Sequence, residues 1–289
     1  MGNERSDAPM SPEEFVEPAL MISGLCFSYP DTPNVLEDVN LKVMPGERVG
    51  LIGPNGAGKT TLFLQICGLL EPSAGQIVVL GKPVKNRDFR PEVGLVFQNP
   101  DDQLFCPSVR DDVAFGLQNM GLSKDEVEAR VTEALSTVGC LELAERPVHH
   151  LSEGEKRMVS IADVLAMWPR LVMYDEPSAN LDIRSRRRLI RLLQASKETM
   201  LIAAHDLELV LEVCNRVVLI DKGQIIVDGN PREIMGDDRL MENHGQEKPH
   251  SLVPHSHKSN NRPTCADSDS PGVIKPQARG SNPGPSPNG

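Results

Sequence analysis

GPNGAGKT, residues 53–60, is the stretch that decides the fold of this chain. It matches the pattern G-x-x-x-x-G-K-[ST], and it lies between a predicted strand and a predicted helix, which is the setting that the pattern requires. Glycines here let backbone N–H groups surround phosphate oxygens, and the helix N-terminus adds the positive end of its dipole. We expect Lys59 to reach the β and γ phosphates and the Thr60 hydroxyl to bind Mg²⁺. The stretch therefore predicts a nucleoside triphosphate site.

Short apolar runs around this stretch predict strands, and amphipathic segments lie between several of them. The predicted strands are Arg48–Gly53, Glu92–Phe97, Leu171–Asp175, Met200–His205 and Val217–Ile220. Such alternation favours an α/β fold with a mostly parallel sheet covered by helices. The turn Asp221-Lys222-Gly223 lies between two apolar runs and predicts a hairpin that closes the domain.

A helical insertion is predicted within this α/β domain, over about residues 99–165. The run Ser123-Lys-Asp-Glu126 is a capping box, and apolar residues then recur at helical spacing, which predicts a helix over about 124–139. The surrounding residues have little strand character. The insertion should therefore be built of helices.

Two carboxylates follow the apolar run that starts at Leu171. Asp175 can bind the Mg²⁺ shell while Glu176 orients or deprotonates the attacking water, a division of roles that phosphoryl transfer to water uses. A strand end that merely turns acidic toward solvent is the alternative reading. His205 ends a later predicted strand and precedes Asp206, the expected N-cap of the next helix; by itself such a histidine would usually be structural.

In this order along the chain, the motifs resemble those of the ATP-binding subunits of ATP-binding cassette (ABC) transporters, over about residues 20–236. By that resemblance the family motifs are Walker A at Gly53–Thr61, the Q-loop at Gln98, the ABC signature at Leu151–Glu155, Walker B at Leu171–Glu176, the D-loop at Ser178–Asp182 and the switch histidine at His205. The implied cofactors are ATP and Mg²⁺. The implied reaction is ATP hydrolysis coupled to transport.

The resemblance also implies individual site residues. Those implied in catalysis are Glu176, His205 and Gln98. Those implied to hold ATP are Tyr29, Gly53, Pro54, Asn55, Gly56, Ala57, Gly58, Lys59, Thr60, Thr61, Ser152, Gly154, Asp175 and Asp182, and those implied to hold Mg²⁺ are Thr60, Gln98 and Asp175. Tyr29 would stack on adenine; a buried core tyrosine is the alternative.

The fold implied by the resemblance is the P-loop NTPase fold of ABC ATPases. It has a mostly parallel core sheet, a small antiparallel β subdomain and the helical insertion inferred above. Two such units would pack head to tail, each ATP lying between Walker A of one and the signature of the other. Because this chain carries both halves of the site, a homodimer is implied, with a heterodimer with a paralogous chain as the alternative.

Residues 98–116, QNPDDQLFCPSVRDDVAFG, resemble one group within the family, the ATPases of energy-coupling-factor importers, and especially those for cobalt and nickel. These importers use the surface after Gln98 to grip a short coupling helix of the transmembrane subunit, and their substrates are vitamins or metal ions. Residues 241–252 also resemble the C-terminal ends of the metal-type members. The implied function is uptake of cobalt or nickel, with a vitamin or another solute as the alternative cargo.

The signature departs from the usual LSGGQ and reads LSEGE, with glutamates at positions 153 and 155. The groups that would meet the γ-phosphate, the Ser152 hydroxyl and backbone N–H groups near Gly154, are retained. Acidic residues in the first turn of a helix are stabilising, so we expect Glu153 to turn outward. We therefore predict an active ATPase rather than a nucleotide sensor without turnover, since Lys59, Asp175 and Glu176 are also intact.

Composition limits the other functions. A net charge of −11 argues against nucleic acid as the main partner, because phosphate-backbone binding needs a basic face. Non-transport ABC proteins usually carry two cassettes or a long coiled-coil insertion, and the sequence shows neither. With no long apolar run and no secretory signal pattern, we expect a peripheral protein at the cytoplasmic face of the cell membrane, held there by transmembrane transporter subunits.

Both ends of the chain are expected to lie outside the folded domain. Residues 1–18 are polar, and residues 241–289 are rich in Pro, Ser, Asn and His, so we predict disorder there and an ABC ATPase domain over 19–240. Neutral imidazoles in the tail are candidate weak ligands for nickel or cobalt; a tail without such a role is the alternative. These candidate ligands are His244, His250, His255 and His257.

Overall fold

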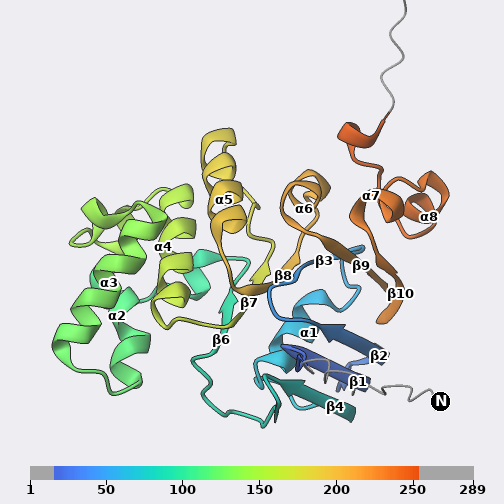
Figure 1. Cartoon of the computed structure of the whole chain (residues 1–289), viewed down its shortest axis with the longest axis horizontal. Helices are drawn as coiled ribbons and strands as arrows, with labels where there is room; N and C mark the ends of the chain where they lie inside the picture. The colour runs from blue at the N-terminus through green and yellow to red at the C-terminus, as the bar shows by residue number, and fades with distance from the viewer. Residues whose placement is uncertain (1–15, 254–289) are drawn as a thin grey trace, which may run out of the picture. The chain divides into compact units, whose positions relative to one another are not determined.

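The computed structural model describes residues 16–253, which contain two sheets (Figure 1). The larger sheet has six strands in the order β10-β9-β3-β8-β7-β6. Its strands are β3 (Arg48–Ile52), β6 (Val93–Val96), β7 (Leu171–Asp175), β8 (Thr199–Ala203), β9 (Arg216–Asp221) and β10 (Gln224–Gly229). All neighbours pair in parallel except β9 and β10, which form the predicted hairpin. The predicted mostly parallel core sheet is confirmed.

The smaller sheet is antiparallel, with strand order β2-β1-β4-β5. Its strands are β1 (Leu20–Tyr29), β2 (Thr32–Val43), β4 (Ala74–Val79) and β5 (Lys82–Pro83). Helix α1 (Lys59–Ile66) lies between the two sheets (Figure 1). Its Leu62 and Phe63 are fully buried in one apolar cluster with side chains of both sheets. This cluster fixes the start of α1, and with it the GPNGAGKT loop, against the parallel sheet.

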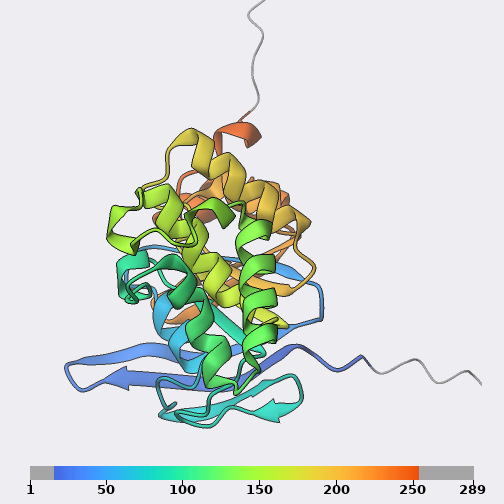
Figure 2. The ribbon, with the colours of Figure 1, turned by 90° about the vertical axis from the view of Figure 1, so that its left-hand side faces the viewer.

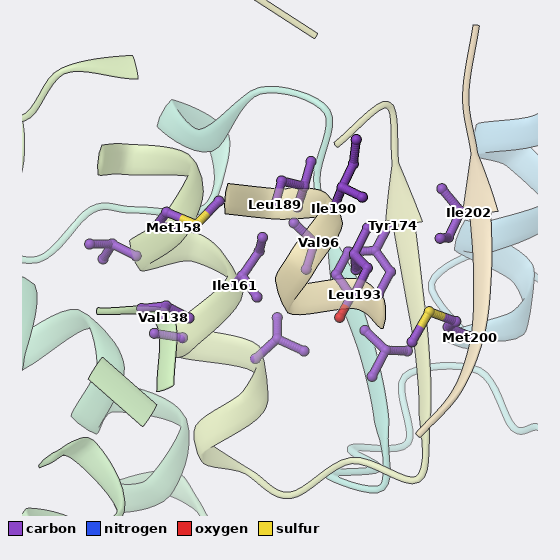
Figure 3. Close-up of a cluster of buried hydrophobic side chains, with 14 of the residues drawn as sticks. Val96, Val138, Met158, Ile161, Tyr174, Leu189, Ile190, Leu193, Met200 and Ile202 are labelled. Carbon is purple, nitrogen blue, oxygen red and sulfur yellow. The ribbon is translucent and has the colours of Figure 1, made fainter. Parts of the chain in front are cut away.

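The other face of the large sheet is covered by a second apolar cluster. The period of two along a strand decides which side chain enters which cluster: Leu171 and Met173 of β7 face α1, whereas Val172 and Tyr174 face the opposite side. Helices α5 (Ile183–Ala195) and α6 (Leu207–Val213) cover that side. Figure 3 shows Leu189 and Leu193 of α5 meeting Tyr174, Met200 and Val96 from three neighbouring strands.

Helices α2 (Val109–Asn119), α3 (Lys124–Val138) and α4 (Glu153–Ala166) form the predicted helical insertion beside β6 (Figures 1 and 2). Both parts of the predicted capping box are present in α3, which ends at Gly139 with a left-handed φ of 65°. Short 3-10 turns connect the insertion at Pro100–Asp102, Leu141–Leu143 and Val148–His150. Val138 of α3 and Met158 and Ile161 of α4 pack into the second cluster (Figure 3), which joins the insertion to the core.

The C-terminal boundary differs from the prediction. The expected end of the domain at residue 240 falls inside α8 (Asp238–Asn243), which follows α7 (Pro231–Ile234), and a 3-10 turn forms at His250–Leu252. Met241 is fully buried, and the Ser251 hydroxyl donates to Glu208 at 2.7 Å. Residues 241–253 therefore pack on the domain, because Met241 is buried in its core and Ser251 is hydrogen-bonded to α6. The remaining predictions of disorder, 1–15 and 254–289, lie outside the described residues.

Strand boundaries also shift by one or two residues elsewhere, and one of these shifts concerns a predicted site residue. The strand predicted to end at His205 ends at Ala203, so His205 lies in the loop after β8. No helix among residues 16–253 combines the length and apolar character needed to cross a membrane.

Candidate active site

The loop of residues 53–58 connects β3 to α1 and approaches its neighbours too closely for larger residues. A Cβ on Gly53 would come within 1.9 Å of the Ile220 carbonyl oxygen. A Cβ on Gly58 would come within 2.7 Å of a Leu36 methyl group, and its φ of 102° is in the left-handed region. Gly56 has a φ of 78° but faces open space. The glycines thus fold the loop tightly and leave its outer side free for a phosphate chain.

Lys59 lies inside this loop. Its Nζ donates to the carbonyl oxygens of Gly53, at 2.8 Å, and Pro54, at 3.1 Å, and the residue is only 8% exposed. Burial lowers the pKa of the ammonium group, and the nearby Glu176 and Asp175 carboxylates oppose this shift. The loop therefore holds one cation at its centre, where an incoming phosphate oxygen would replace the carbonyl acceptors.

Two of the three side chains expected to bind Mg²⁺ are already adjacent. The Thr60 hydroxyl donates to Asp175 Oδ2 at 2.7 Å, joining α1 to the end of β7 across 115 residues of sequence. Burial raises the pKa of the Asp175 carboxyl, while Thr60 and Lys59 act in the opposite direction. Hydroxyl and carboxylate oxygens are ligands that Mg²⁺ accepts. With the exposed Gln98 on the same cavity, these donors fit a magnesium ion bound to a nucleotide.

Glu176 is held in a fixed orientation with one oxygen free. Its Oε2 accepts the main-chain N–H of His205 at 3.0 Å, whereas Oε1 is buried and has no hydrogen-bond partner among the described residues. Its φ of 46° is in the left-handed region, which is unusual for a residue with a side chain. Burial raises the pKa of this carboxyl. A fixed, basic and unpartnered oxygen is what the acceptor of a proton from water requires.

The His205 ring joins three elements at this point. Its Nε2 is 2.7 Å from Asn55 Oδ1 of the phosphate-binding loop and 3.5 Å from Glu176 Oε1. Asp206 caps α6, as predicted, and also pairs with Arg186 of α5 at 2.5 Å. The histidine is therefore placed between the loop and the carboxylate rather than in the core.

Tyr29 is not a core residue. Its side chain is on the surface, with 37% of the residue exposed, and its ring packs edge-on against Phe27 with centroids 4.8 Å apart. The hydroxyl lies 3.3 Å from Thr61 Oγ1. One ring face is thus available beside the phosphate-binding loop, as a stacking surface for a base requires.

These groups line a single cavity of about 760 Å³. The predicted residues that it brings together are Tyr29, Asn55, Gly56, Ala57, Gly58, Lys59, Thr60, Thr61, Gln98, Asp175, Glu176 and His205, with Gly53 and Pro54 holding Lys59 from behind. Sequence reasoning missed other lining residues, which are Thr32, Val35, Ser178, Ala179 and Asp206 as a wall of the cavity. Among these missed residues, only Ser178 and Ala179 were indicated by the sequence, because they belong to the D-loop.

Besides Gly53 and Pro54, three predicted ATP ligands do not line this cavity. Ser152 caps α4, and its hydroxyl donates to Glu155 Oε2 at 2.8 Å. Gly154 lies against α5, where a Cβ would come within 2.4 Å of Ser185 Oγ. Asp182 caps α5 by accepting the Ser185 N–H at 2.9 Å. Within a single chain, Ser152 and Asp182 therefore cap their own helices, and Gly154 lets α4 pack closely against α5.

Glu153 and one tail histidine, His244, pair with charged side chains of the same chain, whereas His250 lies exposed on the surface. The Glu153 side chain is 55% exposed and lies 3.3 Å from Lys156 Nζ. His244 Nδ1 is 2.8 Å from Asp221 Oδ2. Across residues 16–253, no three His, Cys, Asp or Glu side chains are arranged to hold a metal ion. His255 and His257 lie outside the described residues.

The known proteins that this chain resembles in sequence are ATP-binding proteins of ABC transporters. The family model "ABC transporter" matches residues 36–179. A Synechocystis protein described as an ABC transporter ATP-binding protein is 53% identical over 86% of this chain and 87% of its own length. The energy-coupling factor transporter ATP-binding protein EcfA of Methanothermobacter thermautotrophicus is 47% identical over 76% of this chain and 73% of its own length.

A solved structure is also similar. The cbiO1 protein of Clostridium perfringens, described as part of the ABC transporter complex cbiONQ, superposes with a TM-score of 0.70 at 36% identity, covering 78% of this chain and 94% of that one. This chain belongs to the ATP-binding proteins of ABC transporters, has an energy-coupling-factor ATPase among its relatives, and is an ATPase.

Proposed function

We propose that this chain powers an energy-coupling-factor importer for cobalt or nickel ions, working as a dimer at the cytoplasmic face of the membrane. The observation that carries the proposal is the combined likeness to EcfA and to the cbiO1 component of a cbiONQ complex, over most of the chain. The importer assignment rests on this likeness. The choice of metal over a vitamin rests in addition on the resemblance of residues 98–116 to the cobalt and nickel importers.

An exposed aromatic pair supports a membrane partner. Phe105 and Phe115 are 67% and 45% exposed, and their rings meet edge-on with centroids 5.0 Å apart. They follow Gln98 in sequence, with Leu104 buried beneath them. Aromatic residues, Phe among them, are enriched in protein–protein interfaces. This surface suits the apolar side of a short coupling helix from a transmembrane subunit.

Hydrolysis is assigned to the cavity groups of one chain. Lys59 would bind the β and γ phosphates, and Thr60, Asp175 and Gln98 would hold Mg²⁺, which neutralises charge on those phosphates when bound. The free Oε1 of Glu176 would accept a proton from the attacking water. His205, set between Asn55 and Glu176, would orient this water and the γ-phosphate.

The second half of each site would come from another copy of the chain. The Ser152 hydroxyl and the N–H groups near Gly154 begin α4, so the positive end of this helix is available to a γ-phosphate held by the other copy. Two equivalent ATP molecules would then close the dimer. Hydrolysis would reopen it, and the Phe105–Phe115 surface would pass the movement to the membrane subunit.

The test is uptake of labelled Co²⁺ and Ni²⁺ by cells that express this chain with the membrane genes next to it. A Glu176→Gln chain is the control, because it should bind ATP without hydrolysing it. Uptake that depends on Glu176 is the expected result, and the faster ion identifies the cargo. Uptake of neither ion, with ATPase activity intact, would contradict the metal assignment and direct the same assay to labelled vitamins.

A further inference from the structure

Arg157 is the largest fully buried side chain of the chain's described part, and it lies on the signature helix α4 with only 2% of its surface exposed. Its Nη1 donates to the Phe97 carbonyl oxygen at 2.6 Å and its Nη2 to the Gln98 carbonyl oxygen at 2.5 Å. One planar guanidinium thus holds two consecutive carbonyl groups where β6 leads into the Q-loop. Burying such a cation is costly, so a specific role for it is expected.

Arg157 supplies the hydrogen bond to the Gln98 carbonyl group, and the other nearby anchor is Gln103, which accepts the Phe97 N–H at 3.3 Å. The Gln98 side chain makes no hydrogen bond within residues 16–253, is exposed and lines the ATP cavity. Its position therefore depends on where the backbone is held, and at that point Arg157 holds it. A small cavity of about 150 Å³ beside Gln98, Glu153 and Arg157 leaves room for this backbone to shift if the guanidinium is lost.

The negative charge of Glu153 lies near the buried Arg157 guanidinium. It lies four residues before Arg157 on α4, on the same face of the helix. Burial lowers the pKa of Arg157, and the Glu153 and Asp175 carboxylates oppose this shift. The acidic residue that departs from the usual signature thus stands beside the one buried cation of α4.

Other contacts tie α4 to the same loop. Lys156 Nζ lies 2.7 Å from Asp101 Oδ1. Gln103 Nε2 donates to the Ser160 carbonyl oxygen and to Asp163 Oδ2, both at 2.8 Å, while its Oε1 accepts the Phe97 N–H at 3.3 Å. The segment from Phe97 to Gln103 is therefore fastened to α4 at both ends, and α4 begins with the signature.

We propose that Arg157 is a positioning residue for Gln98: it locks the Q-loop backbone to the signature helix, so that Gln98 meets Mg-ATP only when α4 is in place. The idea rests on the proposed role of Gln98 as a Mg²⁺ ligand. It gives this chain a direct mechanical link between the signature, which would meet the other copy's ATP, and the ATP site in its own chain.

The test compares Arg157→Met and Arg157→Lys with a matched control, Arg90→Met, in the full-length chain. Arg90 is also an arginine with a nearly buried side chain, donates to a main-chain carbonyl, that of Val79 at 2.9 Å, and leaves Nη1 unpartnered, but it does not line the ATP cavity. Two quantities are measured for each protein: the Mg²⁺ concentration for half-maximal ATPase activity, and amide hydrogen exchange over residues 97–103 without nucleotide.

For Arg157→Met we expect the half-saturating Mg²⁺ concentration to rise about tenfold, the lower end of the effect of losing a support of a metal ligand. Exchange over 97–103 should accelerate, and ATP affinity without Mg²⁺ should stay within about twofold, since Lys59 is untouched. Arg157→Lys keeps the charge but loses the paired geometry and should give an intermediate shift. It also provides the measurement if the Met variant does not fold.

Arg90→Met should change neither quantity. Arg157 variants that match Arg90→Met in both would overturn the proposal. A shift in Mg²⁺ dependence without faster exchange over 97–103 would do so as well, because the effect would not arise through the Q-loop backbone. A wild-type chain that is inactive even with its membrane subunits would instead contradict the proposed function, and the exchange experiment would still decide whether Arg157 holds the loop.

Discussion

The ATP cavity and the signature region hold their functional side chains in opposite ways. In the cavity, the important contacts join residues far apart in sequence, such as Thr60 with Asp175 and Asn55 with His205. The groups of the signature and the D-loop that cap helices have local partners instead: Ser152 bonds to Glu155 three residues later, and Asp182 to Ser185. The cavity is therefore arranged by the fold of one chain, whereas the signature groups are satisfied by their own helices until something else replaces those partners.

This contrast predicts where a substitution is felt. A change in the cavity should alter chemistry in the isolated chain. A change in the signature region should first alter the stability of its helix, and should affect turnover only when two copies come together.

The largest effect is expected at Glu176. Replacing it with Gln removes the free carboxylate oxygen that would accept a proton, so kcat should fall on the order of 10² to 10⁴-fold while ATP binding persists. The rate of phosphate release and the affinity for a fluorescent ATP analogue measure the two effects. Glu142→Gln, on the exposed surface of the helical insertion, is the control and should leave both unchanged. If the Glu176→Gln protein hydrolysed ATP at the normal rate, Glu176 would not be the group that accepts the proton from the attacking water.

The next effect is expected at Asp163 of α4, whose hydrogen-bond partner, like those in the cavity, is distant in sequence. Burial raises the pKa of Asp163 to about 7, and Asp112 adds to the shift while the Gln103 hydrogen bond opposes it. Between pH 4 and pH 7 the unfolded chain has released this proton and the folded chain has kept it, so raising the pH through this range weakens folding. Asp163→Asn does not titrate there and still accepts from Gln103.

We therefore expect the stability advantage of Asp163→Asn over the wild type to grow by roughly 2–3 kcal/mol from pH 4 to pH 7 and then to level off. Urea denaturation at several pH values measures it. A difference that is constant with pH would show that Asp163 is ionised in the folded protein.

A smaller effect is expected at Ser152, and it separates helix capping from a role in turnover. Ser152 and Ser123 begin α4 and α3 with the same reciprocal capping contacts. Alanine at either position should cost about 1 kcal/mol of folding free energy, measured by urea denaturation. Only Ser152→Ala should also slow ATP turnover, without weakening ATP binding to the isolated chain. Equal turnover in the two variants would mean that the signature serine has no part beyond its cap.

The smallest effect is expected at Glu153. Its carboxylate is half exposed and pairs with Lys156, so Glu153→Gly should change ATP turnover by less than roughly fivefold, in line with the modest free energy of exposed ion pairs. Asp125→Gly, in the first turn of α3, controls for the loss of helix stability. A hundredfold faster Glu153→Gly enzyme would mean that this carboxylate repels the phosphates after all.

The fold class could be predicted from patterns along the chain, and much of the cavity from the resemblance of its motifs to those of the ABC ATPases. Apolar runs of strand length, a capping box at Ser123 and the spacing of GPNGAGKT are read within a few residues, and each formed as predicted. The boundary at residue 240 failed for a related reason. Polar composition indicated disorder beyond this residue. In the structure, however, Met241 is buried in the apolar core and His244 pairs with the Asp221 carboxylate, so the folded domain extends further.

What the sequence determined by itself is the chemistry available to this protein: a phosphate-binding loop, two carboxylates after a strand, a histidine after another, and a signature with two added acids. The tertiary structure alone decided how these groups are connected. The 2.7 Å contact between Thr60 and Asp175 and the grip of Arg157 on the carbonyls of Phe97 and Gln98 span 115 and about 60 residues. Such contacts depend on how helices pack against a sheet, and no local pattern of side chains encodes that packing.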